Sequence, residues 1–150
     1  MPSNLSAYFQ ETPTLRISEL ARLSGRSTHT IRWYEAQHLM PGAARDAGGR
    51  RMFSQAHVDW LGLLGRLRDS GMSVRDMQAF TRLVRQGKAS LADCRRMLQD
   101  HRVKVQQRAD ELGEALALVD HKIGLYDKWL ARATANGGSA QSVTRAGVKA

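Results

Sequence analysis

Cysteine, aromatic residues and long apolar runs are scarce in this 150-residue chain, and each shortage excludes a class of protein. The single cysteine, Cys94, excludes an intrachain disulfide framework and a zinc site built from several thiolates. No apolar run approaches the roughly 20 residues of a membrane-spanning helix, so we expect no membrane segment. Residues 1–11 lack a basic start followed by an apolar stretch. We therefore expect no secretion signal, and a cytoplasmic, reducing location.

Positive charge, by contrast, is in excess. The 23 Lys and Arg residues outnumber 14 Asp and Glu, which gives a formal net charge of +9. This basicity favours a polyanionic partner such as nucleic acid. His57, Asp59 and Asp69 show no catalytic arrangement, and no glycine-rich phosphate loop precedes a helix. We therefore do not expect an enzyme.

Turn residues and composition divide the chain into four parts. We expect residues 1–13 to be flexible, residues 14–86 to form a compact basic head, and residues 90–131 to form one long helix. Residues 132–150 are rich in Gly, Ser, Ala and Thr and have almost nothing to bury, so we expect a disordered tail. The predicted fold class is mainly α.

Helical spacing predicts two short helices at the start of the head. Ile17, Leu20 and Ala21 share one face of the first helix, which Gly25 can end because glycine adopts the left-handed conformation easily. The second helix, from about residue 28 to 37, can be capped by a hydroxyl at residue 27 or 28. Two helices joined by such a turn form a helix-turn-helix.

The outer face of the second helix carries Thr28, Thr30 and Arg32, which suit contacts in a DNA major groove. A helical hairpin with a solvated polar face is the alternative interpretation. Residues 41–54 then predict a small β-hairpin, or wing, around Gly48 and Gly49. Its arginines, at positions 45, 50 and 51, are placed to contact phosphates; the alternative is a loop that they merely solubilise.

Two further helices complete the predicted head. The first begins near Ser54, and the segment Gly71–Ser73 separates it from the second. Trp60 and Phe80 lie on the apolar faces of these helices. We expect both aromatic rings to pack in the core rather than to bind a ligand.

The long helix has the apolar pattern of a coiled coil. One series repeats every seven residues and a second is offset from it by four, which together give a 4-3 seam. The predicted dimerisation residues are Leu98, Val105, Leu112, Leu116, Val119, Ile123, Tyr126 and Leu130. Since the chain has no second helix of adequate length, we predict a homodimer. The alternative is that the helix packs back on its own head.

Metal binding and redox sensing have little support in the sequence. Cys94 could share a site with His101 or His121, but their spacing enforces no ligand set. Arg95 and Arg96 could lower the pKa of the Cys94 thiol, which is a weak indication of a reactive thiol. We expect no metal and no cofactor.

Five segments, taken in order, resemble the MerR family of bacterial transcription regulators. They are Ile17–Ala21, Thr30–Glu35, Leu39–Pro41, Arg45–Phe53 and Arg66–Ser73, and the resemblance covers about residues 15–83. It implies a winged helix-turn-helix head followed by a long antiparallel coiled-coil dimerisation helix. It also implies a homodimer that binds a pseudo-palindromic promoter, distorts the DNA between the −35 and −10 elements, and acts with RNA polymerase.

The resemblance implies DNA contacts from Arg32 and Tyr34 on the recognition helix, from Arg45 and Arg51 on the first wing, and from Arg75 on the second. The complete predicted DNA-binding set is Arg16, Ser27, Thr28, Thr30, Arg32, Tyr34, Arg45, Arg50, Arg51 and Arg75. We therefore predict a sequence-specific, double-stranded-DNA-binding transcription regulator. A dimeric protein-interaction module without DNA binding is the alternative.

Three positions depart from the family pattern. Trp33 stands where the family usually has Tyr or Phe, an aromatic exchange that preserves packing. His38 replaces a common helix-ending glycine and is strained if its backbone is left-handed. Arg50 and Phe53 replace wing tyrosines, which removes phenolic hydrogen bonds and adds one charge.

Overall fold

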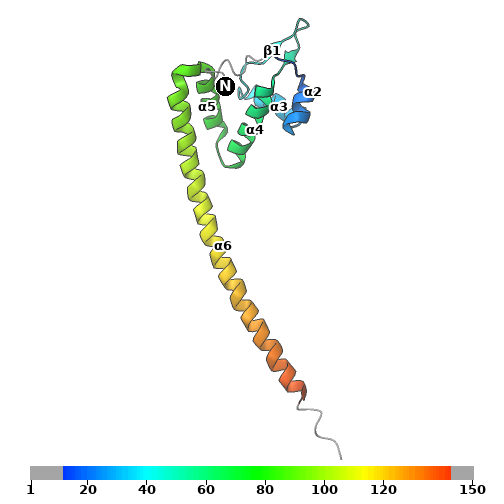
Figure 1. Ribbon diagram of the computed structural model, residues 1–150, viewed down its shortest axis with the longest axis vertical. Helices are drawn as coiled ribbons and strands as arrows, with labels where there is room; N and C mark the ends of the chain where they lie inside the picture. Colours follow the sequence, from blue (N-terminus) through cyan, green and yellow to red (C-terminus); the bar gives the residue numbers. More distant parts are fainter. Residues whose placement is uncertain (1–11, 143–150) are drawn as a thin grey trace, which may run out of the picture. The chain divides into compact units, whose positions relative to one another are not determined.

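The computed structural model describes residues 12–142, with side chains described to residue 137. It divides into two compact units, one up to Val105 and one from Gln106. The elements shown in Figure 1 are α2 (Ile17–Ser24), α3 (Thr28–Ala36), β1 (Ala44–Arg45), β2 (Arg51–Met52), α4 (Gln55–Asp69), α5 (Val74–Gln86), the 3-10 helix η1 (Gly87–Ser90) and α6 (Leu91–Ser142). The predicted mainly α class, with a small hairpin and a long final helix, is confirmed.

The end predicted for the long helix is wrong. We expected it to end at residue 131, but α6 continues to Ser142. Residues 132–142 contain no proline, so none of them blocks a helix that is already nucleated upstream, and α6 continues through Gly137 and Gly138. Residues 1–11 and 143–150, to which most of the predicted flexible start and the rest of the predicted tail belong, lie outside the described residues. None of the described helices is long and apolar enough to span a membrane.

Local hydrogen bonds set the bounds of the helix-turn-helix. The Arg16 amide before α2 donates to Glu19 Oε2 at 2.9 Å, and α2 ends at Gly25, whose φ of 65° is left-handed. Ser27 then caps α3, because its Oγ accepts a hydrogen bond from the Thr30 amide at 3.0 Å. The predicted helix, turn and second helix are confirmed.

The wing is a two-stranded antiparallel hairpin in which Ala44 pairs with Met52 and Arg45 with Arg51. Its turn contains Gly49 at φ 77°, a conformation that favours glycine. A bridge between Leu15 and Phe53 joins the base of the wing to the segment before α2. The wing is therefore anchored to the helix-turn-helix at its base.

One apolar core holds the head together. Trp60 and Phe80 are buried and their rings stack with centroids 5.6 Å apart, which confirms their predicted core position. The largest fully buried apolar side chains are Tyr34, Phe53, Leu20, Ile31, Leu39, Leu61, Leu64, Met77 and Val84. They come from α2 to α5 and from the loops between them, so the core fixes α3 against the other helices.

Side chains of α4 and α5 also hold the segment Gln37–Pro41, which we term the recognition-helix loop because it follows α3. Four of its carbonyl oxygens each accept a side-chain hydrogen bond. The donors and acceptors are Gln78 Nε2 to Gln37 O, Trp60 Nε1 to Leu39 O, Arg85 Nη2 to Met40 O, and His57 Nε2 to Pro41 O. His38 in this loop has a φ of 57°, so its backbone is left-handed and the strain considered for this position applies.

The buried His57 has a defined protonation state. The Ser54 amide donates to its Nδ1 at 3.0 Å, so Nδ1 carries no proton and Nε2 donates to Pro41 O at 3.1 Å. Burial is the main cause that lowers the pKa of His57 from its ordinary value, while hydrogen bonds to the Pro41 and Gly42 backbone oppose it. His57 is therefore a neutral donor at physiological pH.

Candidate nucleic-acid interface

The outer face of α3 presents the polar side chains predicted to read DNA. Ser27, Thr28 and Arg32 are exposed and Thr30 is half-buried. The Ser27 and Thr30 hydroxyls lie 2.8 Å apart and form a hydrogen bond. Because each hydroxyl oxygen can make further bonds, this pair does not prevent a contact with DNA.

Tyr34 corrects the predicted contact set. Its side chain is 1% exposed and packs in the core, with its ring 5.4 Å from that of Trp33 in an edge-to-face arrangement. It lies three residues after the fully buried Ile31, so helical geometry directs both side chains inward. In this structure Tyr34 supports α3 and has no surface with which to touch DNA.

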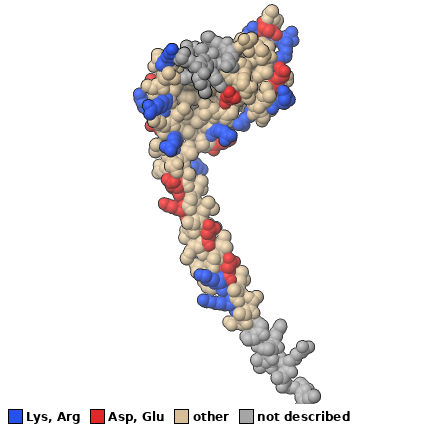
Figure 2. Space-filling model, in the orientation of Figure 1, with Lys and Arg blue, Asp and Glu red and all other residues tan. Residues whose placement is uncertain are grey.

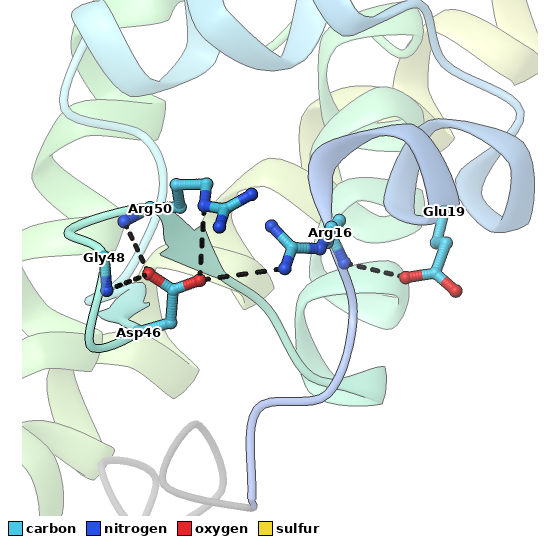
Figure 3. A network of polar contacts seen from close by, with 5 residues as sticks. All are labelled: Arg16, Glu19, Asp46, Gly48 and Arg50. Atoms are coloured by element: carbon cyan, nitrogen blue, oxygen red, sulfur yellow. Dashed lines mark hydrogen bonds and ion pairs between the residues drawn. The ribbon is translucent and has the colours of Figure 1, made fainter.

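A network around Asp46 joins the wing to the start of α2 (Figure 3). Asp46 Oδ1 accepts hydrogen bonds from the Gly48 and Arg50 amides at 2.9 and 2.8 Å. Its Oδ2 lies 3.6 Å from Arg50 Nε and 3.8 Å from Arg16 Nη2. The hydrogen bond from the Arg50 amide is the main cause that lowers the pKa of Asp46. Desolvation, the next largest effect, opposes it, and the Gly48 amide and the two guanidinium charges lower the pKa further. The ionised carboxylate thus holds both arginines beside the wing.

An open cavity of about 400 Å³ lies between the start of α2, α3 and the wing. We term it the arginine cavity, because five arginines line it together with Ile17, Ser18, Glu35 and Gly49: Arg16, Arg32, Arg45, Arg50 and Arg51. All five were predicted to contact DNA. Guanidinium groups donate paired hydrogen bonds to phosphate oxygens, so the cavity suits a polyanion. Figure 2 shows Lys and Arg side chains distributed over the visible face of the head.

The remaining predicted contacts lie outside this cavity. Ser27, Thr28 and Thr30 occupy the start of α3, and Arg75 is exposed in the first turn of α5. The structure therefore gathers the arginines of α2, α3 and the first wing into one site. It leaves Arg75 as a separate exposed cation.

Sequence reasoning missed two residues that support the interface. The Arg68 guanidinium of α4 lies over the Trp33 ring, 4.8 Å from its centroid, and so braces α3 from behind. Glu35 Oε1 pairs with Arg51 Nη1 at 3.2 Å. Helical periodicity could have indicated Glu35, because it follows the buried Ile31 by four residues and so shares its inner face.

The predicted dimerisation residues fall into two groups. Leu98 is half-buried and packs against the core of the head, so it serves the head as well as any seam, and Val105 is also half-buried. The others are more than half exposed in the single chain: Leu112, Leu116, Val119, Ile123, Tyr126 and Leu130. This row of exposed apolar side chains on one helix has no cover from the described part of its own chain.

Cys94 lies in the core of the head and is 6% exposed. In the part of the chain that the structure describes, no group of three or more His, Cys, Asp or Glu residues could hold a metal ion.

Comparison with known proteins identifies the family. Residues 15–84 match the model of the MerR HTH family regulatory protein. An uncharacterized HTH-type transcriptional regulator of Haemophilus influenzae is 29% identical over 115 residues, which cover 77% of this chain and 85% of that protein.

Two solved structures share the fold as well as the sequence. A crystal structure assigned to the MerR family from Listeria monocytogenes is 30% identical, with a TM-score of 0.80, and the match covers 87% of this chain and 99% of that one. HiNmlR, a MerR family regulator lacking the sensor domain and bound to promoter DNA, is 29% identical, with a TM-score of 0.69, over 79% of this chain and 94% of that one. On this evidence the chain belongs to the MerR family of transcriptional regulators.

Proposed function

We propose that this regulator binds promoter DNA as a homodimer, with α3 in the major groove and the arginine cavity against the phosphate backbone of each half-site. The observation that carries the proposal is the cavity itself, in which five guanidinium groups surround a space beside an exposed helix face. The similarity to HiNmlR, which was crystallised on promoter DNA, supports it. On this assignment residues 14–86 are the DNA-binding domain.

Dimerisation in the proposal rests on α6. Leu112, Leu116, Val119 and Ile123 are each 51–63% exposed in the single chain and are spaced four, three and four residues apart. That spacing is the 4-3 pattern of a coiled-coil seam, and a second copy of the same helix would bury it. We assign the part of α6 that carries this seam to an antiparallel coiled coil, which would place the two heads on separate half-sites.

The regulatory step follows from the family assignment. Two heads fixed by one coiled coil would hold a promoter whose −35 and −10 elements are too far apart, and would distort the DNA between them so that RNA polymerase can use both. This takes place in the cytoplasm, where the promoter and the polymerase are. No enzymatic step is required by the proposal.

Binding is tested with the region upstream of the regulator's own gene as a fluorescent duplex, and a scrambled duplex of equal length. If Arg16, Arg45, Arg50 and Arg51 of both heads each neutralise one phosphate, log affinity should fall with log salt with a slope of about −7. Equal affinity for the two duplexes, or an affinity that does not change with salt concentration, would contradict the proposal. Dyes at the two duplex ends report distortion by energy transfer, and light scattering gives the mass of the complex.

A further inference from the structure

Glu35 carries a carboxylate that the stability of the head does not explain. Its side chain is 13% exposed, and its Oε1 is buried without a hydrogen-bond partner among the described residues. The Arg51 Nη1 atom, 3.2 Å away, forms an ion pair with this oxygen. A buried carboxylate oxygen without hydrogen bonds is unfavourable, because the hydrogen bonds that it made to water in the unfolded chain are not replaced. Among the described residues, the ion pair with Arg51 is what offsets the burial of this oxygen.

The position of the Glu35–Arg51 pair indicates a role in DNA binding. Glu35 belongs to α3 and Arg51 to β2, so the pair joins the recognition helix to the wing. Both residues line the arginine cavity, and both also line a second cavity of about 190 Å³ beside the recognition-helix loop. With space on either side, the Arg51 side chain is not fixed by packing alone. The ion pair is what sets its direction.

We propose that Glu35 is a positioning residue that orders Arg51 for a backbone phosphate in the arginine cavity. A guanidinium group has five N–H donors, so Arg51 can keep its contact with Glu35 and still donate to a phosphate. Arg51 remains 45% exposed, which leaves part of the group accessible. This inference rests on the proposed function, since the phosphate belongs to the DNA that the head binds.

The consequence is discrimination between DNA sequences. Ordering a long side chain before binding reduces the entropy lost on binding. This gain in affinity arises only where a phosphate lies in the direction that Arg51 already takes. A phosphate lies there when α3 sits on the promoter sequence that it recognises. DNA held in another register gains nothing from an ordered Arg51. Glu35 therefore strengthens binding to the promoter and leaves binding to other DNA unchanged.

The test is Glu35→Gln, which keeps the shape and removes the charge. Promoter affinity should fall about three- to tenfold per head, the range for losing the prior order of one side chain. Affinity for the scrambled duplex should stay equal or rise, because the net charge becomes more positive. A rise for both duplexes would indicate a role through charge alone, and a fall for both would indicate damage to the fold; either result overturns the inference. The exposed Asp69→Asn gives the same charge change outside the cavity, and thermal unfolding checks that E35Q is folded.

A second pair of variants shows whether Glu35 acts through Arg51. Arg51→Gln should weaken binding to both duplexes, and adding E35Q to it should cause no further loss of promoter affinity. A further loss equal to that of E35Q alone would overturn the inference. If the wild-type protein does not prefer its promoter, the proposed function and the inference both fail. If the wild-type protein prefers its promoter and E35Q binds both duplexes with wild-type affinity, the proposed function stands and the inference fails.

Discussion

Replacing Arg32 with alanine tests the proposed contact between α3 and the bases of the DNA. Arg32 is exposed, lines the arginine cavity, and has no ion pair or hydrogen bond among those that the described residues form. Its removal should therefore leave the fold intact, and any loss of affinity can be assigned to the interface. The size of the loss then distinguishes a base contact from a phosphate contact.

The two contacts predict different magnitudes. A direct base contact is worth about 1–3 kcal/mol, so two heads lose about 2–6 kcal/mol, or about 30-fold to about 20,000-fold in promoter affinity. The loss would be confined to the promoter. One phosphate contact per head at about 0.15 M salt is worth about fivefold, or about 30-fold for the dimer, on any sequence, and it lowers the salt slope by about 2. From the position of Arg32 on the outer face of α3, we expect the larger, promoter-specific loss.

Fluorescence anisotropy with promoter and scrambled duplexes, repeated over a salt series, measures both quantities. The matched control is Arg82→Ala, which removes an exposed arginine of α5 outside the arginine cavity. Circular dichroism confirms that both variants are folded. Unchanged promoter affinity in folded R32A would refute the assignment of Arg32 to the interface.

Three further changes probe dimerisation, the loop after α3 and its strained residue. Leu116→Asp should give monomers that no longer bind a two-half-site promoter, because dimerisation would bury one unpaired charge from each protomer in the seam, at a cost of several kcal/mol. Leu118 is equally exposed but lies off the seam, so Leu118→Asp should remain dimeric in light scattering. The free energy of unfolding of the wild-type protein should fall as pH drops below about 6.5, because His57 takes up a proton in the unfolded chain while its lowered pKa keeps it neutral in the folded one. In urea unfolding between about pH 7.5 and about 5.5, His57→Gln should show a smaller fall. His38→Asn should stabilise the head by about 0.5–1 kcal/mol, because asparagine tolerates the left-handed backbone better. The melting temperature should rise by about 2–3 °C, and an unchanged or lower value would contradict this.

Local signals explain why the sequence predicted the head so closely. The cap at Ser27, the left-handed Gly25 and the Gly48–Gly49 turn each act within a few residues, so their effects can be read from the chain directly. The core position of Trp60 and Phe80 followed from the apolar faces of α4 and α5, whereas the stacking of their rings did not. The five arginines that line the arginine cavity were also singled out from the sequence, but not their convergence there, which depends on how the wing folds against α2.

Burial, and pairing between elements, account for what sequence reasoning missed. Helical spacing from Ile31 places Tyr34 on the inner face of α3, but its polar hydroxyl on a predicted recognition helix favoured a DNA contact. Glu35 pairs with Arg51 across two elements. The helix beyond residue 131 continues because no proline interrupts it, although its content of Gly, Ser and Thr resembles that of a disordered tail.

The recognition-helix loop has a consequence for how the head can be divided. Its four carbonyl oxygens bind donors that lie 16 to 45 positions apart from them in the chain. A fragment that ends before α5 lacks the donors from Gln78 and Arg85, and buried carbonyl groups without donors are costly. The helix-turn-helix is therefore not a transplantable module. A chimera that exchanges DNA specificity between regulators must carry α4 and α5 along with α3, because side chains of α4 and α5 fix the loop that follows α3.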